Sequence, residues 1–155
     1  MEFKQQLALV IHCVRSAYNV GSIMRTADAM GVSEVFICGY SPTPNSKKVA
    51  KTSLGAEKVV PWKKYNHTWE LLRNLKSKGY RIAALEINEK SSLLARYKPK
   101  FPLALMVGNE KKGLSKIILK YTDNVIKIPM HGKKESLNVA VATGIALYKI
   151  NERRR

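Results

Sequence analysis

The sequence lacks the features that would mark a membrane, disulfide-linked or metal-binding protein. No segment reaches the roughly 18 consecutive apolar residues of a membrane span, and only two cysteines are present. Cys13 and Cys38 each fall in an apolar segment, which favours free, buried thiols in a reducing, cytoplasmic compartment. No histidine, cysteine or carboxylate cluster has the spacing of metal ligands. We therefore expect a soluble cytoplasmic protein without a metal or a membrane segment.

Acidic residues are also scarce. The chain has 11 Asp and Glu against 28 Lys and Arg, a formal net charge of +17. This excess indicates a polyanionic partner, nucleic acid first, although a solvated basic surface would have the same composition. The basic residues gather at Lys47/Lys48/Lys51, Lys63/Lys64, Lys111/Lys112, Lys133/Lys134 and Arg153/Arg154/Arg155.

Apolar runs alternate with helical patterns along the chain, and the length of 155 residues predicts a single domain, residues 1–155. The runs predict strands at residues 7–14, 34–38, 58–62, 81–85, 103–107 and 124–128. Helical spacing predicts helices at residues 19–31, 66–78, 115–121 and 136–150, and leaves residues 47–57 ambiguous. The alternation predicts an α/β fold with a mostly parallel sheet flanked by helices.

The last predicted helix is apolar on nearly every side. Between Val139 and Tyr148 only Thr143 and Gly144 interrupt the apolar sequence. A sheet covers one side of such a helix, so we expect the other side to pack against a second subunit in a two-fold dimer. A helix enclosed within one chain is the alternative.

Three motifs stand where a predicted strand leads into a loop or a helix. In NVGSIMRTAD (residues 19–28), Arg25 lies opposite the apolar stripe of its helix and is free to bind a phosphate. In VGNEKKG (residues 107–113), a glycine-rich backbone follows a buried strand, at the sheet edge where ligands bind in α/β proteins. A simple helix cap at Asn19, a solvated Arg25 and a surface carboxylate at Glu110 are the alternatives.

The third motif, IPMHGKKESLNVA (residues 128–140), brings polar side chains and free N–H groups together at a helix start. Ser136 and Asn138 could bind a ligand there, although Ser136 could also be a plain helix cap. His131 lies in this motif, but a lone loop histidine is more often incidental than a general base.

In this order the motifs resemble the SpoU family of the SPOUT methyltransferases, which methylate the ribose 2′-hydroxyl of tRNA or rRNA with S-adenosylmethionine. The likeness rests on N-x-G-x-x-x-R from Asn19 to Arg25, G-N-E-x-x-G over residues 108–113, and I-P-M-x-G-x-x-x-S-L-N-V over residues 128–139, supported by KTSLGA at residues 51–56. It covers the chain from Leu7 to Tyr148. The resemblance implies a deep C-terminal trefoil knot, an obligate homodimer and a catalytic domain without an additional RNA-binding extension.

The resemblance also implies site residues. Those expected to bind S-adenosylmethionine are Leu85, Glu86, Gly108, Asn109, Glu110, Ile128, Met130, Ser136, Leu137 and Asn138. The catalytic candidates are Arg25, Asn19, Glu110, Ser136 and Asn138. In this hypothesis Arg25 acts on the 2′-hydroxyl together with an RNA phosphate, Asn19 orients Arg25, Ser136 and Asn138 position the reactants, and Glu110 has no assigned role.

The expected RNA contacts are Arg25, Lys47, Lys48, Lys51, Lys111, Lys112, Lys133 and Lys134. Two alternatives stay open at this point. One is a related enzyme that methylates a base nitrogen, and the other is a non-catalytic RNA-binding protein with the same fold.

Overall fold

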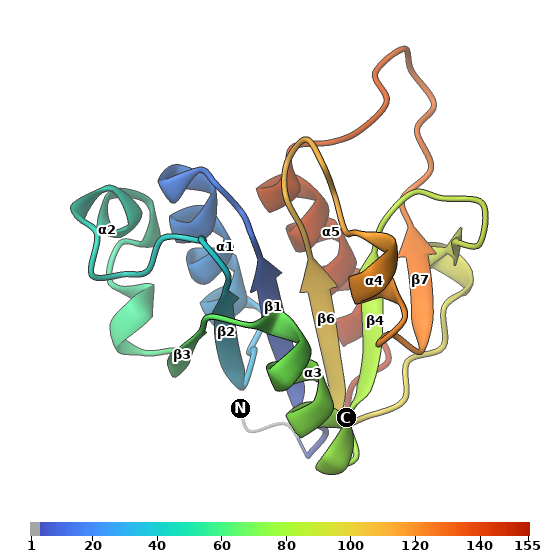
Figure 1. Ribbon diagram of the computed structural model, residues 1–155, viewed down its shortest axis with the longest axis horizontal. Coiled ribbons are helices and arrows are strands. Elements are labelled where there is room, and N and C mark those ends of the chain that lie inside the picture. The colour runs from blue at the N-terminus through green and yellow to red at the C-terminus, as the bar shows by residue number, and fades with distance from the viewer. Residues whose placement is uncertain (1–3) are drawn as a thin grey trace.

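A parallel sheet lies at the centre of the protein. The computed structural model describes residues 4–155, within which seven strands lie in the order β3-β2-β1-β6-β4-β7-β5 (Figure 1). Every pair of neighbouring strands is parallel. The strands are β1 Leu7–His12, β2 Glu34–Cys38, β3 Trp62–Tyr65, β4 Arg81–Leu85, β5 Ser92–Leu93, β6 Leu103–Val107 and β7 Asn124–Lys127. The predicted α/β fold with a parallel sheet is confirmed.

Helices cover both faces of this sheet (Figure 1). One face carries α1 (Ala17–Ala29), α2 (Lys47–Ser53) and α5 (Val139–Asn151), with the 3-10 turns η1 (Ala56–Lys58) and η2 (Leu94–Arg96). The other face carries α3 (Thr68–Ser77) and α4 (Lys116–Leu119). Side chains alternate along β1, so Leu9 packs with α1 and α5 while Val10 packs with α3. A strand buried on both faces must be apolar, and β1 is apolar and buried from Leu7 to Ile11.

Helices α1 and α5 do not begin at the residues that the motifs predicted. Helix α1 is capped by Ser16, whose Oγ accepts the N–H of Asn19 at 3.2 Å, so Asn19 lies inside the helix. Helix α5 is capped by Asn138, whose Oδ1 accepts the N–H of Ala140 at 2.8 Å, so Ser136 lies in the preceding loop. The side chains of Asn19 and Ser136 therefore do not cap the helices that their positions suggested.

The strand predicted at residues 58–62 is wrong. Residues 56–58 form η1 and the strand begins at Trp62. Pro61 has no N–H and contributes only its carbonyl, which accepts the N–H of Val35 at 2.9 Å, so regular pairing starts after it. The ambiguous residues 47–57 contain α2 and the start of η1.

Both cysteines are free thiols, as expected. Cys38 ends β2 and is buried, and this burial raises its pKa to about 12 despite a hydrogen bond with Thr68. Cys13 is only half-buried and lies just beyond β1, at a positive φ of 54°. Its placement inside a strand was therefore wrong. None of the helices in the described part of the chain has the length and hydropathy of a membrane span.

Helix α5 is covered on one side only. Its inner side, which includes Ala146, Leu147 and Ile150, is buried against the sheet and α1. On the outer side, Val141 is 52% exposed, Ile145 43% and Tyr148 63%. The alternative of a helix enclosed within one chain is therefore wrong, and an apolar stripe faces outward at helical spacing.

The terminal arginine triplet is not a uniform basic cluster. Arg153 and Arg155 are exposed, but Arg154 is only 9% exposed. Its Nε donates to the carbonyl of Gln5 at 2.7 Å and its Nη1 to the carbonyl of Gly31 at 2.8 Å. Arg154 thus fastens the C-terminus to the chain before β1 and to the turn after α1, and burial lowers its pKa.

Gly21 lies where α1 meets α2. A methyl group on Gly21 would collide with Thr52 Oγ1 and with the backbone carbonyl of Val49. Gly21→Ala is therefore expected to lower the free energy of unfolding by about 1–3 kcal/mol, the usual cost of overpacking. Urea unfolding measures this change. Gly132→Ala is the matched control because its new methyl group would meet nothing within 4 Å, and a Gly21→Ala protein as stable as wild type would contradict the prediction.

Candidate active site

A cavity of about 400 Å³ opens at the carboxyl edge of the sheet, between the loops that follow β4, β6 and β7. We call it the edge cavity. Of the residues expected to bind a cofactor, all except Asn138 line it: Leu85, Glu86, Gly108, Asn109, Glu110, Ile128, Met130, Ser136 and Leu137. These residues lie on three loops that are distant in sequence, and the parallel strands bring them together because their carboxyl ends meet at one edge.

Several further residues line the edge cavity and were not expected there. They are Ile87, Val107, Lys111, Gly113, Lys127, Glu135, Val139 and Ala142. Taking every residue of the second and third motifs as a candidate would have found five of them, and Ile87 and Lys127 directly adjoin predicted residues. Ala142 follows Val139, which also lines the cavity, by three residues, and the helical period places the two on the same side of α5.

Glu86 and Gly113 shape one wall of the edge cavity. Glu86 Oε2 accepts the N–H of Leu114 at 2.7 Å, and its Oε1 accepts the N–H of Ile87 at 3.0 Å. Gly113 has φ of 63°, and a methyl group added to it would collide with the Glu86 carboxylate. The glycine of the second motif is therefore required both by its backbone conformation and by this close approach.

Asn109 holds its own loop. Its Oδ1 accepts the N–H groups of Lys111 and Lys112, at 2.9 and 2.8 Å. Its Nδ2 donates to the carbonyl of Cys13 at 3.0 Å and to Tyr40 Oη at 2.8 Å. All the polar atoms of this side chain are used to position the loop beside β1.

Glu110 joins the second motif to the first. Its Oε1 accepts the N–H of Ser16 at 3.0 Å and the Nδ2 of Asn19 at 3.4 Å. Its Oε2 accepts the N–H of Arg15 at 3.1 Å. A carboxylate at a helix N-terminus satisfies N–H groups that have no partner within the helix. Glu110 is therefore more than a surface carboxylate.

Asn19 links this pair to the third motif. Its Oδ1 accepts a hydrogen bond from Asn138 Nδ2 at 3.2 Å, while Asn138 Oδ1 caps α5. A continuous chain of hydrogen bonds thus runs from Glu110 through Asn19 to Asn138. This chain joins all three motifs within one molecule, although their residues are 91 and 119 positions apart.

The hydrogen bonds to Glu110 shift its titration. Burial acts to raise its pKa, but the hydrogen bonds from the backbone of Ser16, Glu110 and Arg15 and from the side chain of Asn19 outweigh it, so the pKa lies below its ordinary value. Because the pKa is lower in the folded than in the unfolded protein, ionised Glu110 stabilises the fold above the ordinary carboxyl pKa. That stability is lost as the pH falls through the folded value.

Glu110→Gln is accordingly expected to lower Tm at pH 7 by about 3–8 °C, because the N–H groups lose a charged acceptor. The difference from wild type is expected to shrink as the pH falls below the ordinary carboxyl pKa and through the lower pKa of folded Glu110, because the wild-type carboxylate then becomes protonated as well. Thermal unfolding followed by circular dichroism measures both. Glu89→Gln, an exposed carboxylate in a neighbouring loop, is the control. A Tm difference that does not change with pH would contradict the prediction.

Arg25 lies outside the edge cavity. It is exposed on α1, in a separate hollow lined by Ser22, Arg25, Thr26, Ala29, Lys51, Thr52 and Leu54, which we call the Arg25 hollow. Asn19 binds Glu110 and Asn138, so the expected contact in which Asn19 orients Arg25 is not made within this chain. Within residues 4–155, neither Arg25 nor Ser136 makes a side-chain hydrogen bond or an ion pair.

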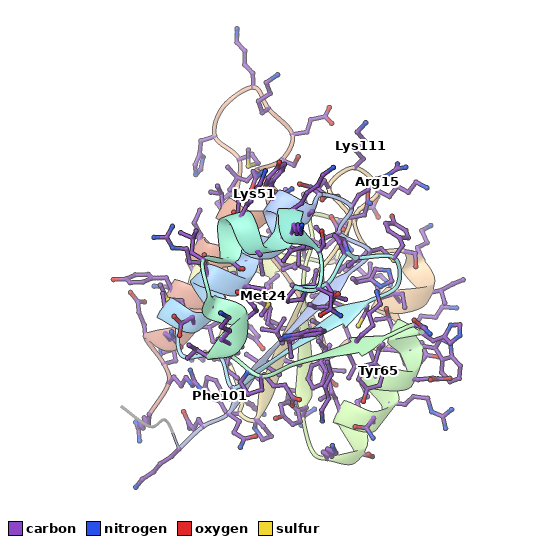
Figure 2. All side chains as sticks on the ribbon, turned by 90° about the vertical axis from the view of Figure 1, so that its left-hand side faces the viewer. Arg15, Met24, Lys51, Tyr65, Phe101 and Lys111 are labelled. Atoms are coloured by element: carbon purple, nitrogen blue, oxygen red, sulfur yellow. The ribbon has the colours of Figure 1, made fainter. Side chains whose placement is uncertain are left out.

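The lysines expected to contact RNA are all exposed. Lys47, Lys48 and Lys51 lie on α2, and Lys51 lines the Arg25 hollow. The other four lie on the loops around the edge cavity. Figure 2 shows Arg15, Lys51 and Lys111 in the same upper part of the molecule. Exposed basic side chains therefore lie near both openings.

No group of three or more histidine, cysteine or carboxylate side chains in residues 4–155 could hold a metal ion. His131 is exposed in the loop before α5. His12 Nδ1 lies 2.7 Å from Thr68 Oγ1, and burial lowers the pKa of this histidine. The polar groups available around the cavity are thus amides, carboxylates, Ser136 and cations.

Comparison with known proteins agrees with this arrangement. Residues 6–148 match the SpoU rRNA Methylase family model. The chain is 31% identical over 151 residues to a putative TrmH family tRNA/rRNA methyltransferase, YacO, of Bacillus subtilis (strain 168), an alignment that covers 97% of this chain and 60% of that relative. This chain therefore spans less than two thirds of that relative's length.

Two solved structures share the fold. An AdoMet-bound rRNA methyltransferase from Sinorhizobium meliloti superimposes with a TM-score of 0.90 at 27% identity, over 98% of this chain and 58% of that one. A structure from a study of the 2-OH methylation of C/U34 on tRNA superimposes with a TM-score of 0.86 at 27% identity, over 96% of both chains. The second match covers almost the full length of both chains.

Proposed function

Because this chain belongs to the SpoU rRNA Methylase family, we propose that it transfers a methyl group from S-adenosylmethionine to a ribose 2′-hydroxyl of tRNA or rRNA. The observation that carries the proposal is that the second and third motifs line the edge cavity, while hydrogen bonds from Asn138 to Asn19 and from Asn19 to Glu110 join the first motif to both of them. The strong positive charge supports RNA as the substrate.

The edge cavity is suited to S-adenosylmethionine. Its volume lies within the usual range for small-molecule sites. Ile128, Met130 and Leu137 provide apolar walls, and a methyl group on the buried Gly108 would crowd Leu114, so backbone lines this part of the cavity. The Sinorhizobium meliloti relative was solved with AdoMet bound. When bound, this cofactor supplies a methyl group that is already activated by its sulfonium centre.

The hydrogen bonds divide the candidate catalytic residues into two groups. The side chains of Asn19, Glu110 and Asn138 bind one another or cap helices, so we assign them the role of positioning the loops. Arg25 and Ser136 are left to contact RNA. Arg25 stays protonated, so it binds and orients an RNA phosphate, and that phosphate accepts the proton from the attacking 2′-hydroxyl. Ser136 lies at the mouth of the edge cavity and orients the ribose.

A two-fold dimer completes this site in our proposal. Arg25 and the edge cavity are separate within one chain, and the outer side of α5 exposes Val141, Ile145 and Tyr148. Pairing two α5 helices through this stripe would bury it and combine Arg25 of one subunit with the cavity of its partner. The exposed apolar stripe supports a dimer formed through the C-terminal helix.

We also propose the deep C-terminal trefoil knot. The strand order supports the knot, because β6 and β7 come later in the chain than β4 but lie on either side of it. After β7 the chain also returns to α5, on the face of the sheet that carries α1 (Figure 1). Backbone tracing in an experimental density map tests this, and an unthreaded path would contradict it. Residues 1–155 then act as one catalytic domain, comparable in length to the chain from the tRNA study.

Incubation with tritiated S-adenosylmethionine and either bulk tRNA or bulk rRNA tests the function. We expect tritium in RNA, and nuclease digestion with mass spectrometry is expected to yield a 2′-O-methylated nucleoside. A methylated base would indicate the base-nitrogen alternative. RNA binding without transfer, together with no binding of S-adenosylmethionine in calorimetry, would indicate the non-catalytic alternative. The names of the relatives include both tRNA and rRNA, so the assay is run with each RNA in turn.

A further inference from the structure

An exposed aromatic ring stands beside the edge cavity. Tyr40, in the loop after β2, is 58% exposed, although its hydroxyl accepts a hydrogen bond from Asn109 Nδ2 at 2.8 Å. Asn109 lines the edge cavity. Tyr40 is therefore attached at its hydroxyl end to the second motif, while more than half of the residue faces solvent.

The backbone around Tyr40 is also held firmly. Lys64 Nζ donates to the carbonyls of Gly39 and of Ser41, the two neighbours of Tyr40 in the chain. Ser41 Oγ accepts the N–H of Val14 at 2.8 Å. Hydrogen bonds thus fix Tyr40 both at its neighbouring backbone and at its hydroxyl, and the ring is held in place by these bonds more than by burial.

The surroundings of Tyr40 are cationic. Through its Oδ1 and Nδ2, Asn109 connects Tyr40 to the backbone of Lys111, and Glu110 binds the backbone of Arg15. Arg15 and Lys111 are both exposed, and Figure 2 shows them close to each other at the edge of the molecule. Rigid aromatic rings among cations are the usual platform for unpaired bases, whereas cations alone bind the sugar-phosphate backbone.

We propose that Tyr40 stacks against an unpaired nucleobase of the RNA substrate and so holds the RNA strand beside the edge cavity. This inference rests on the proposed function, because it requires an RNA substrate. The fixed ring has already lost its conformational freedom before RNA arrives, so stacking costs less entropy than it would with a mobile side chain. Because every base has a flat face, the contact contributes affinity without specifying a sequence.

The experiment compares Tyr40→Ala, Tyr40→Phe and wild type for binding to a fluorescein-labelled single-stranded RNA of mixed sequence, by fluorescence anisotropy. Tyr40→Ala is expected to weaken RNA binding by roughly tenfold or more. Tyr40→Phe keeps the ring but loses the hydrogen bond with Asn109, so it is expected to stay within about threefold of wild type. Calorimetry is expected to give the same affinity for S-adenosylmethionine in all three proteins.

Two controls separate stacking from other roles. Inorganic polyphosphate carries charge but no bases, so Tyr40→Ala is expected to bind it as wild type does. Trp69→Ala removes an exposed aromatic ring on α3, which lies on the other face of the sheet and against Arg73, and is expected to leave RNA affinity unchanged.

Each contrary result overturns the inference. Wild-type RNA affinity in Tyr40→Ala would show that Tyr40 does not contact RNA. Equal losses of RNA affinity in Tyr40→Phe and Tyr40→Ala would show that Tyr40 acts only through its hydroxyl bond to Asn109. A loss of polyphosphate binding in Tyr40→Ala as large as its loss of RNA binding would show that the effect is one of charge and not of stacking. A loss of RNA affinity in Trp69→Ala as large as that in Tyr40→Ala would show that removing any exposed aromatic ring has this effect. A wild-type protein that binds no RNA would overturn the proposed function together with this inference, whereas the other results leave the proposed function standing.

Discussion

Arg25→Ala is expected to reduce methyl transfer to RNA by roughly a hundredfold or more, while the affinity for S-adenosylmethionine stays at its wild-type value. The guanidinium is exposed in the Arg25 hollow and has no hydrogen-bond partner among residues 4–155, so its removal costs the fold little. It is also absent from the lining of the edge cavity. This variant should therefore lose methyl transfer without losing affinity for S-adenosylmethionine.

The measurement is the rate of tritium transfer to RNA at saturating cofactor, with calorimetry for cofactor affinity. Arg25→Lys keeps the charge but not the planar fork that holds a phosphate through two bonds, so it is expected to lose most of the activity as well. Arg73→Ala is the charge-matched control, since Arg73 is exposed on α3 and contacts Trp69. Near-wild-type transfer by Arg25→Ala would remove Arg25 from the mechanism.

The second large effect is expected from Ile145→Glu, which should convert a dimer into monomers and abolish methyl transfer. Ile145 is 43% exposed in the middle of the outer stripe of α5, between Val141 and Tyr148. A carboxylate there is hydrated in the monomer but would have to be buried without a partner in the dimer, at a cost of several kcal/mol. Analytical ultracentrifugation measures the mass, and the transfer assay measures the activity.

Ile117→Glu is the matched control for this variant. Ile117 is 69% exposed on α4, which covers the opposite face of the sheet, so a charge there should leave both mass and activity unchanged. Circular dichroism tests whether Ile145→Glu remains folded. A folded Ile145→Glu monomer with full activity would contradict the shared site, and an unchanged mass would contradict the proposed interface.

Mixed dimers test directly whether subunits share a site. Arg25→Ala leaves the edge cavity intact, whereas Leu137→Arg is designed to fill the cavity and leave Arg25 intact. If each site combines Arg25 of one subunit with the cavity of the other, a dimer of the two variants contains one intact site and recovers activity. If each site lies within one chain, the mixture stays inactive.

Much of the fold could be predicted because its signals are local. The strands at residues 34–38, 81–85 and 103–107 have the bounds expected from their apolar runs, since a strand buried on both faces requires neighbouring apolar side chains. The same periodicity placed Arg25 on the exposed side of α1. The predicted strand at residues 58–62 failed because Pro61, which cannot donate to a partner strand, delays pairing until Trp62.

The position of the site followed partly from the sequence pattern and partly from the family resemblance. The pattern placed the second and third motifs at one edge of a parallel sheet, and the resemblance to the SpoU family added the loop after β4 and the cofactor residues, nearly all of which line the edge cavity. The roles of their side chains did not follow. Glu110, expected near the reaction without a defined role, accepts hydrogen bonds from Arg15, Ser16 and Asn19 instead.

The sequence by itself therefore determined most of the elements, the parallel sheet and the edge where its polar segments gather, because apolar periodicity and turn residues act over a few neighbouring positions; it did not predict α2 or the short strand β5. Only the tertiary structure decided which polar groups are already satisfied and which are free. Asn19 finds partners 91 and 119 residues away, Arg154 turns inward to Gln5 and Gly31, and Arg25 stands apart from the edge cavity. Such pairings depend on how distant segments pack, and no local pattern records them.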